Sequence, residues 1–265
     1  MQRSPHMPEA PLKGVGVLVT RPRLQATELV SSIESAGGTT FCFPVMEITP
    51  LDDNVVSASA AALPKPDIVI FVSRNAVEYG LRYTGGGKIA VIGPATAAAV
   101  RAAARVVDIQ PASGFDSEHL LEEPAFRDVA GKHVRIIRGN DGRELLSTEL
   151  AARGASVDYL SVYDRHLPDV GPELLASIES QWRQGSINVI TVMSVQSLQN
   201  LAALLPAWCE RQIESVPLVT PAGRVLKEAL DRYPASRPIL ASGPRASDMV
   251  EAIIALHQTD RGPAP

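Results

Sequence analysis

The sequence predicts an α/β protein with two Rossmann-like or flavodoxin-like lobes, parallel sheets, an internal duplication and a two-strand linker. Its 265 residues are about twice the length of a common domain. Short apolar runs rich in β-branched residues alternate with helical stretches, which is typical of parallel sheets with right-handed crossovers. One block of the chain also recurs in its second half at a fixed spacing.

The first strand is predicted over residues 15–20, because this run is short, apolar and β-branched and suits burial on both faces. The next helix is predicted from apolar residues at helical spacing, namely Leu24, Leu29, Val30 and Ile33. Gly37-Gly38 ends it before a strand over 39–43. Further elements are expected as strand 67–72, helix 75–83, strand 88–92, helix 94–104, strand 106–109 and helix 116–126.

Two blocks of the sequence repeat, which predicts a duplicated strand-helix-strand unit. One ungapped shift aligns Gly14 with Gly131, Arg21 with Arg138, Leu29 with Leu146, Ile33 with Leu150 and Gly37 with Gly154. A second block pairs residues 67–73 with residues 188–194 at a slightly different shift. Extended segments bounded by proline, 44–50 and 161–168, interrupt both halves at matching places and are interpreted as paired linkers. The lobes could be consecutive, or the linkers could cross, and periodicity does not choose between these layouts.

Composition excludes several classes of protein. The net charge of −4 argues against nonspecific binding to nucleic acid or to membrane surfaces, and aromatic residues at 5% offer few stacking platforms. No apolar run approaches the roughly 20 residues that cross a bilayer, and the N-terminal residues lack the apolar core of a signal peptide. We therefore expect a cytoplasmic protein. Cys42 and Cys209 are expected to be reduced, and the scattered histidines indicate no metal site.

Ligands of open parallel sheets bind beyond the carboxyl ends of the strands, so the residues there are the candidates for a binding site. Small hydroxyl residues, glycines and arginines at helix N-termini suit an anionic ligand. These candidates are Arg21, Ser73, Arg74, Gly93, Thr96, Arg138, Gly139, Ser194, Thr220 and Gly223. Each also has a plainer explanation, since Ser73, Thr96 and Ser194 could simply cap helices and both Arg21 and Arg138 could pair with carboxylates.

Several catalytic motifs are missing from the sequence. Gly14-x-Gly16 precedes a strand instead of following one, and there is no Walker loop and no G-x-S-x-G elbow. Tyr163 lies in the second predicted linker, where the repeat places Met46 in the first. A tyrosine at this place is often a packing residue, but a linker between lobes would face the cleft where ligands bind.

In their order and spacing, several motifs resemble the uroporphyrinogen-III synthase family from about residue 13 to 256. They are residues 17–22 (VLVTRP), Phe43-Pro44 with Pro50, 67–77 (DIVIFVSRNAV), 89–97 (IAVIGPATA), Arg138-Gly139 with Gly142-Arg143, Gly154-Ala155, 162–165 (VYDR) and 247–250 (SDMV). The resemblance implies a discontinuous first lobe, residues 1–43 with 167–265, and a second lobe of residues 46–163.

The resemblance also implies a reaction without a cofactor. The family converts the linear tetrapyrrole hydroxymethylbilane to uroporphyrinogen III, with loss of water and inversion of ring D through a spiro intermediate. Tyr163 matches the tyrosine proposed to assist departure of the hydroxyl group, and Ser73, Thr96 and Ser194 match positions taken to contact substrate. Thr220-Pro-Ala-Gly223 departs from the Gly-x-x-Thr pattern, so main-chain donors could serve there.

The resemblance further implies a monomer that could contact the preceding deaminase transiently. A rival hypothesis is a non-catalytic bilobal protein that binds an anionic small molecule. It would explain two lobes and a missing catalytic set, but it does not require the ordered motifs or Tyr163.

Overall fold

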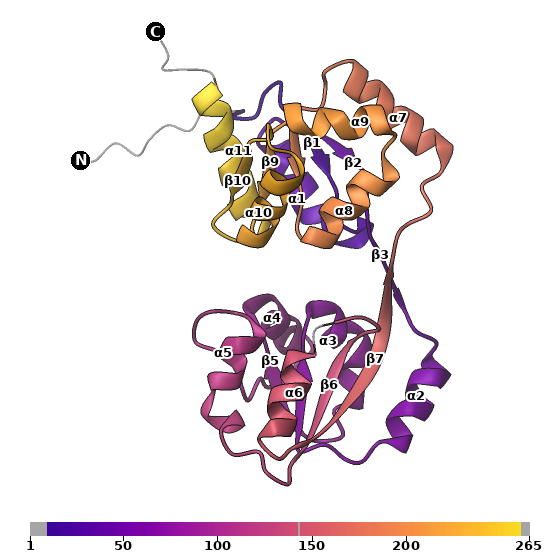
Figure 1. Ribbon diagram of the computed structural model, residues 1–265, viewed down its shortest axis with the longest axis vertical. Helices are drawn as coiled ribbons and strands as arrows, with labels where there is room; N and C mark the ends of the chain where they lie inside the picture. Colours follow the sequence, from indigo (N-terminus) through magenta and orange to yellow (C-terminus); the bar gives the residue numbers. More distant parts are fainter. Residues whose placement is uncertain (1–9, 143, 261–265) are drawn as a thin grey trace, which may run out of the picture. The chain divides into compact units, whose positions relative to one another are not determined.

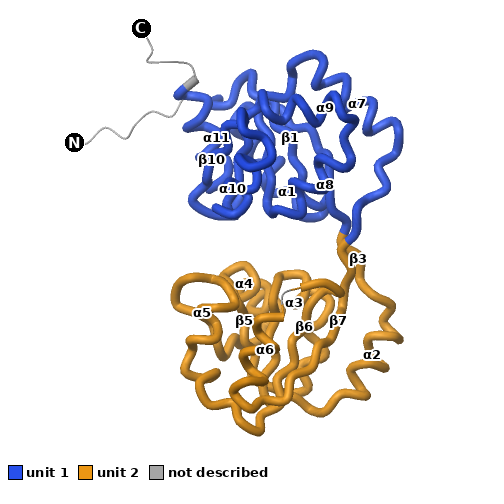
Figure 2. The backbone as a smooth tube through the Cα atoms, viewed as in Figure 1, with its two compact units in different colours: residues 1–47, 166–265 blue, residues 48–165 orange. Residues whose placement is uncertain are grey.

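The computed structural model describes residues 10–142 and 144–260. The chain divides into two compact units (Figure 2): unit 1 is Met1–Glu47 with His166–Pro265, and unit 2 is Ile48–Arg165. The expectation that the chain has no signal peptide concerns N-terminal residues, most of which lie outside the described residues. Arg143 also lies outside them. Within the described ranges, no helix is long and apolar enough to cross a membrane.

Unit 1 contains a five-stranded parallel sheet in the order β10-β9-β8-β1-β2 (Figure 1). Its strands are β1 Gly16–Val19, β2 Thr39–Cys42, β8 Val189–Thr191, β9 Leu218–Thr220 and β10 Pro238–Leu240. Its helices are α1 Arg23–Ser35, α7 Pro172–Arg183, α8 Val195–Leu204, α9 Ala207–Gln212, α10 Gly223–Arg232 and α11 Ala246–Asp260, with a short 3-10 turn at Ile213–Ser215.

Both faces of this sheet are buried, which explains the continuous apolar runs. Leu18 and Ile190 point into a core shared with α7, α8 and α10. Val17 and Val189 point to the other face, into a core shared with α1 and α11. Leu24, by contrast, is 83% exposed, so its predicted place on the buried face of α1 is wrong. Ala26, Leu29 and Ile33 form that face instead.

Unit 2 contains a five-stranded sheet in the order β3-β7-β6-β4-β5, of which β7, β6, β4 and β5 run parallel. Its strands are β3 Glu47–Pro50, β4 Ile68–Phe71, β5 Lys88–Val91, β6 His133–Gly139 and β7 Ser156–His166. Its helices are α2 Asp53–Ala62, α3 Arg74–Gly80, α4 Pro94–Ala102, α5 Ser117–Glu122 and α6 Leu145–Ala152. The prediction of an α/β fold with parallel sheets is confirmed.

Several predicted elements of unit 2 are shorter than expected. The segment 106–109 is not a strand: Val106 is 73% exposed, and Ile109 alone forms a bridge, to Ala90. The expected helices 75–83 and 116–126 each break into an α-helix and a 3-10 turn, at Leu81–Tyr83 and Pro124–Phe126. Pro124 explains the second break because proline has no N–H to continue the helix. The first residues of the predicted linker 161–168 form the end of β7, which extends to His166 at the boundary between the two units.

The repeated glycines occupy matching conformations in the two units. Gly14 and Gly131 have φ of 82° and 74°, and Gly37 and Gly154 have φ of 86° and 84°, a region that favours glycine. The same amide contacts recur as well: Asn188 accepts from the Gly16 N–H at 2.7 Å, and Asp67 accepts from the His133 N–H at 2.8 Å. The equivalent strands β1 and β6 therefore begin in the same way.

The two cysteines occupy different environments, although both are free. Cys209 is buried in the unit 1 core, and this burial raises the pKa of its thiol to about 11. Cys42 ends β2 and is exposed. In the part of the chain that the structure describes, no three potential metal ligands gather in one group.

Candidate active site

The predicted site residues lie at the carboxyl ends of the strands or in the first turn of the next helix. In unit 2 these positions are Ser73 and Arg74 after β4, Gly93 and Thr96 after β5, Arg138 and Gly139 at the end of β6, and Tyr163 near the end of β7. In unit 1 they are Arg21 after β1, Ser194 after β8, Thr220 at the end of β9 and Gly223 at the start of α10. Direct contacts join Ser73, Tyr163 and Gly139 within unit 2.

Tyr163 is fully buried, with an exposed fraction of 0%, and it belongs to the core of unit 2. This burial agrees with the packing explanation for a tyrosine at this position, and not with a side chain that faces a cleft from a linker. Its register explains the difference: Arg138 pairs with Ser161 and Gly139 with Tyr163, so Val162 is an extra residue in β7. Such a bulge re-aims the following side chain, and here it turns the Tyr163 ring over the end of β6.

Gly139 makes room for this ring. A Cβ atom at residue 139 would lie 2.6 Å from Cε2 of Tyr163, closer than any carbon contact allows. The ring of Tyr79 on α3 lies against the same tyrosine at 6.1 Å between centroids. Gly139 therefore acts through packing, and its small size is what seats the phenol at the end of the sheet.

The Tyr163 hydroxyl has two polar neighbours. Its oxygen lies 3.1 Å from Oγ of Ser73 and accepts a hydrogen bond from Nη2 of Arg165 at 2.8 Å. The Arg165 guanidinium also lies 5.3 Å from the centre of the Tyr163 ring. Sequence reasoning gave Arg165 no role, although residues two apart on a strand share a face, and that spacing is the signal that could have found it.

Ser73 and Ser194 are both helix N-caps, as their plainer explanation held. Oγ of Ser73 accepts from the Ala76 N–H and Oγ of Ser194 accepts from the Ser197 N–H, each at 3.1 Å. Ser73 differs from Ser194 because it also contacts a buried phenol. The Ser194 hydroxyl instead lies 2.8 Å from that of Ser197.

Thr96 is not a cap, so that prediction is wrong. Helix α4 begins at Pro94 with Gly93 as its N-cap, which places Thr96 inside the first turn with only 5% exposure. Gly93 has no side chain to cap with, so the first N–H groups of α4 are not bonded by the capping residue. Thr220 is fully buried, and its Oγ1 accepts from the Ala222 N–H at 3.3 Å.

Helix α10 of unit 1 has no side-chain cap either, since Ala222 occupies that position and exposed Gly223 follows it. Main-chain N–H groups are therefore available at the start of α10. This leaves open the main-chain role that the sequence suggested for the Thr220–Gly223 turn.

The two strand-end arginines differ in their surroundings. Arg138 stacks on the ring of Tyr159 at 3.9 Å, and its Nη2 lies 3.2 Å from Oε1 of Glu144. Hydrogen bonds from Tyr159 and Arg138 hold the pKa of Glu144 below its ordinary value. Arg138 thus pairs with a carboxylate, as its plainer explanation held.

Arg21 makes no ion pair within the described residues. Its Nη2 donates to the carbonyl oxygen of Pro244 at 2.7 Å, while its Nε is buried without a hydrogen-bond partner there. Burial lowers the pKa of Arg21, and the charge of Glu28 offsets this in part. Its positive charge is therefore less compensated at close range than that of Arg138.

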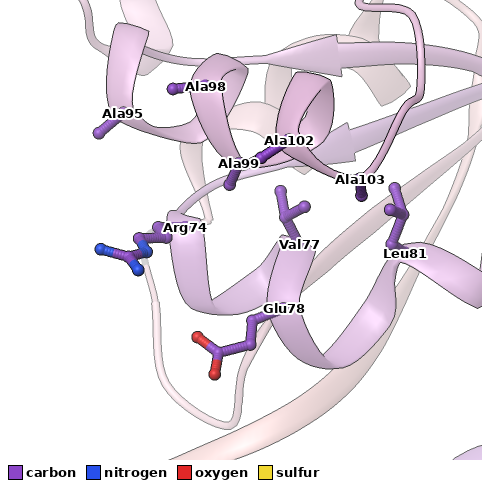
Figure 3. A pocket seen from close by; sticks show the side chains of 9 residues that line it. All are labelled: Arg74, Val77, Glu78, Leu81, Ala95, Ala98, Ala99, Ala102 and Ala103. Carbon is purple, nitrogen blue, oxygen red and sulfur yellow. The ribbon is translucent and has the colours of Figure 1, made fainter. Parts of the chain in front are cut away.

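A groove of about 670 Å³ runs between α3 and α4 of unit 2 (Figure 3). Figure 3 shows the alanines of α4 facing Val77 of α3 and Leu81 of the following 3-10 turn, with Arg74 at the end where both helices begin. Arg74 is exposed, and the described part of the chain gives it no hydrogen bond or ion pair. It is thus a cation that a ligand could use at the carboxyl edge of the unit 2 sheet.

A family model and individual relatives all match this chain to the same family. Residues 27–251 match the family described as Uroporphyrinogen-III synthase HemD. A uroporphyrinogen-III synthase of Escherichia coli is 31% identical over 206 residues, which cover 73% of this chain and 81% of that protein. A putative uroporphyrinogen-III synthase of Methanothermobacter thermautotrophicus is 31% identical over 194 residues, covering 69% of this chain and 75% of the relative.

Two solved structures share the fold. A uroporphyrinogen III synthase from Thermus thermophilus matches with a TM-score of 0.61 and 19% identity, covering 91% of this chain and 98% of that one. A uroporphyrinogen-III synthetase from Helicobacter pylori matches with a TM-score of 0.60 and 12% identity, covering 91% and 99%. From the family match over most of its length, this chain belongs to the uroporphyrinogen-III synthase family.

Proposed function

We propose that this protein cyclises hydroxymethylbilane to uroporphyrinogen III in porphyrin and haem biosynthesis. The observation that carries this proposal is the family match over residues 27–251, together with relatives at about 31% identity named for this reaction. The site fits the proposal, because hydroxyls, arginines and uncapped helix N-termini at the strand ends suit a substrate with many carboxylates.

The proposed reaction begins with loss of the hydroxyl group of the ring-A hydroxymethyl as water, which leaves an azafulvene. The already substituted α carbon of ring D attacks the methylene carbon of the azafulvene and forms a spiro intermediate. The intermediate reopens and recloses with ring D reversed. The electron-rich pyrroles supply the reactivity, so the protein mainly holds one folded conformation, and orientation of this kind can contribute roughly 7–11 kcal/mol. No step of this sequence calls for a cofactor.

Site roles follow from charge and position. Arg21 and Arg74 are the proposed partners of substrate acetate and propionate groups, since both lie at strand ends and neither has an ion pair in the described structure. Arg138, Ser194, Gly93, Thr96, Thr220 and Gly223 are proposed to shape and hold the same ligand. Tyr163 is proposed to assist departure of the hydroxyl group, with Gly139 providing its seat and Ser73 beside it.

We also propose that the two units are lobes produced by duplication, with a discontinuous first lobe, and with β3 and the end of β7 as the connections. The matching φ angles of Gly14 and Gly131 support this proposal, as do the matching contacts of Asn188 and Asp67. A cytoplasmic monomer that contacts the deaminase transiently stays a prediction.

The isomer of the product tests the proposed function. Porphobilinogen and a deaminase supply hydroxymethylbilane, and the oxidised products are separated by chromatography with and without this protein. Spontaneous closure gives isomer I, so we expect isomer III only when the protein is present. Isomer I alone, from folded protein, would contradict the synthase and favour the binding-protein hypothesis.

A further inference from the structure

We infer that Ser73 donates the proton to the leaving hydroxyl group, that Tyr163 then donates its own proton to Ser73, and that Arg165 positions the Tyr163 hydroxyl. This inference rests on the proposed function and gives the site a direction of proton flow. It assigns the contact with substrate to a serine, in place of the tyrosine, and a positioning role to Arg165.

Burial is the first argument. Tyr163 is 0% exposed and is packed between Tyr79 and the end of β6, so its hydroxyl does not reach solvent. Ser73 is half-buried at the end of β4 and lies 3.1 Å from the tyrosine oxygen. A ligand at the carboxyl edge of this sheet therefore meets the serine before it meets the phenol.

Hydrogen-bond capacity is the second argument, because it fixes which way each proton points. A guanidinium only donates, so the Tyr163 oxygen accepts the bond from Arg165 at 2.8 Å. The buried hydroxyl proton of Tyr163 also needs an acceptor, and donation to Oγ of Ser73, 3.1 Å away, supplies one. Arg165 thereby selects one of the two possible directions of the Ser73–Tyr163 bond.

Ser73 completes the chain of donors. A serine hydroxyl has two acceptor positions and one proton. The Ala76 N–H fills one acceptor position at 3.1 Å, and Tyr163 fills the other. In this arrangement neither contact uses the Ser73 proton, so the proton can be donated to a ligand at the strand end.

The proton-transfer step balances. As the bond between carbon and oxygen of the hydroxymethyl group breaks, its electron pair stays on the oxygen, which takes the Ser73 proton and leaves as water. The Tyr163 proton moves to Ser73, and the resulting phenolate is held by the Arg165 cation. The proton that the substrate loses when the last pyrrole regains its aromaticity returns to Tyr163 through Ser73.

Two substitutions at Ser73 separate proton delivery from helix capping. Asparagine keeps an oxygen that caps α3 but has no acidic hydroxyl, whereas threonine keeps both functions. We expect Ser73→Asn to lower kcat for isomer III formation by about 10²–10⁴-fold, the range of a general acid, with KM changed less than about threefold. Ser73→Thr should recover kcat to within about tenfold of the wild type.

The pair Ser73 and Tyr163 is tested as a unit. Because both residues act on one proton, Ser73→Asn with Tyr163→Phe should be no slower than the slower single variant. Arg165→Lys keeps a donor and should retain more kcat than Arg165→Met. Tyr83→Phe is the matched control, because Tyr83 also lies 3.1 Å from a serine hydroxyl, that of Ser57, but outside the site; its kcat should equal that of the wild type.

The outcomes are distinguishable. Wild-type protein that yields only isomer I contradicts the proposed function itself. Wild-type protein that yields isomer III, with a Ser73→Asn kcat close to wild type or with effects of Ser73 and Tyr163 that multiply, overturns the relay and leaves the synthase standing.

Discussion

Where β1 pairs with β2, unit 1 sets Leu18 beside Phe41, whereas unit 2 sets Arg135 beside Asp158 at the corresponding register of β6 and β7. Leu18 is fully buried in an apolar core, and Arg135 is 3% exposed. The same strand order thus holds an apolar pair in one unit and an ion pair in the other. Apolar periodicity specifies that these positions are buried, but it does not require that they be apolar.

Several contacts hold the ion pair of Arg135 and Asp158 in unit 2. Nε of Arg135 lies 2.9 Å from Asp158, and its Nη2 donates to the Pro64 carbonyl at 2.7 Å. His133 contacts the other carboxylate oxygen of Asp158. Removing one partner of such a pair leaves a buried charge, whereas replacing both with apolar groups is often nearly neutral.

The largest expected effect is therefore that of Asp158→Ala, which should lower the free energy of unfolding by about 3–5 kcal/mol, measured by urea denaturation of the full chain. The double variant Arg135→Leu with Asp158→Phe copies the unit 1 pair and should be more stable than the single variant. A loss below about 1 kcal/mol for Asp158→Ala would show that the ion pair is not what holds this part of unit 2.

A second difference lies at the strand ends, where Gly139 of unit 2 corresponds to Pro22 of unit 1 in the repeat register. Gly139→Ala forces a methyl group against the Tyr163 ring and should cost about 1–3 kcal/mol of stability, with loss of activity as the phenol moves. Pro22→Ala removes only the restriction that proline places on the unfolded chain. It should lower the free energy of unfolding by about 0.4–1 kcal/mol in the same urea titration. Equal losses at the two positions would contradict the packing role of Gly139.

Much of the fold could be predicted from sequence because it depends on local rules. Val17, Leu18 and Val19 are apolar since both sheet faces are covered, and Gly37 ends α1 where φ is 86°. Predictions failed where tertiary contacts decide. Leu24 fits helical spacing but has no neighbour to bury it, and Val106 is β-branched but lies outside the sheet.

The candidate site could be predicted only as separate residues. Ser73 and Tyr163 are 90 positions apart, and their contact depends on a bulge in β7 that no local pattern signals. The bulge also explains why a tyrosine in a predicted linker segment packs into a core. The role of Arg165 required its contact with the buried phenol oxygen, which only the folded chain provides.

The smallest expected effect concerns the strand-end arginines. A ligand carboxylate must compete with Glu144 for Arg138, whereas Arg21 makes no ion pair among the described residues. Arg21→Gln should therefore raise KM for hydroxymethylbilane by about tenfold, near the lower end expected for a hydrogen bond to a charged group. Arg138→Gln should raise it less, within about threefold.

Glu144→Gln is the matched variant for this comparison, because it weakens the pairing of Arg138 while leaving its stacking on Tyr159 intact. If Glu144 competes with substrate, this change should lower KM, and a second substitution, Arg138→Gln, should then raise KM as much as Arg21→Gln does. Steady-state kinetics at low and high salt would check the electrostatic origin, since salt screens exposed charges more than buried ones. A larger effect of Arg138→Gln than of Arg21→Gln in the unaltered background would reverse the assignment and make unit 2 the main carboxylate binder.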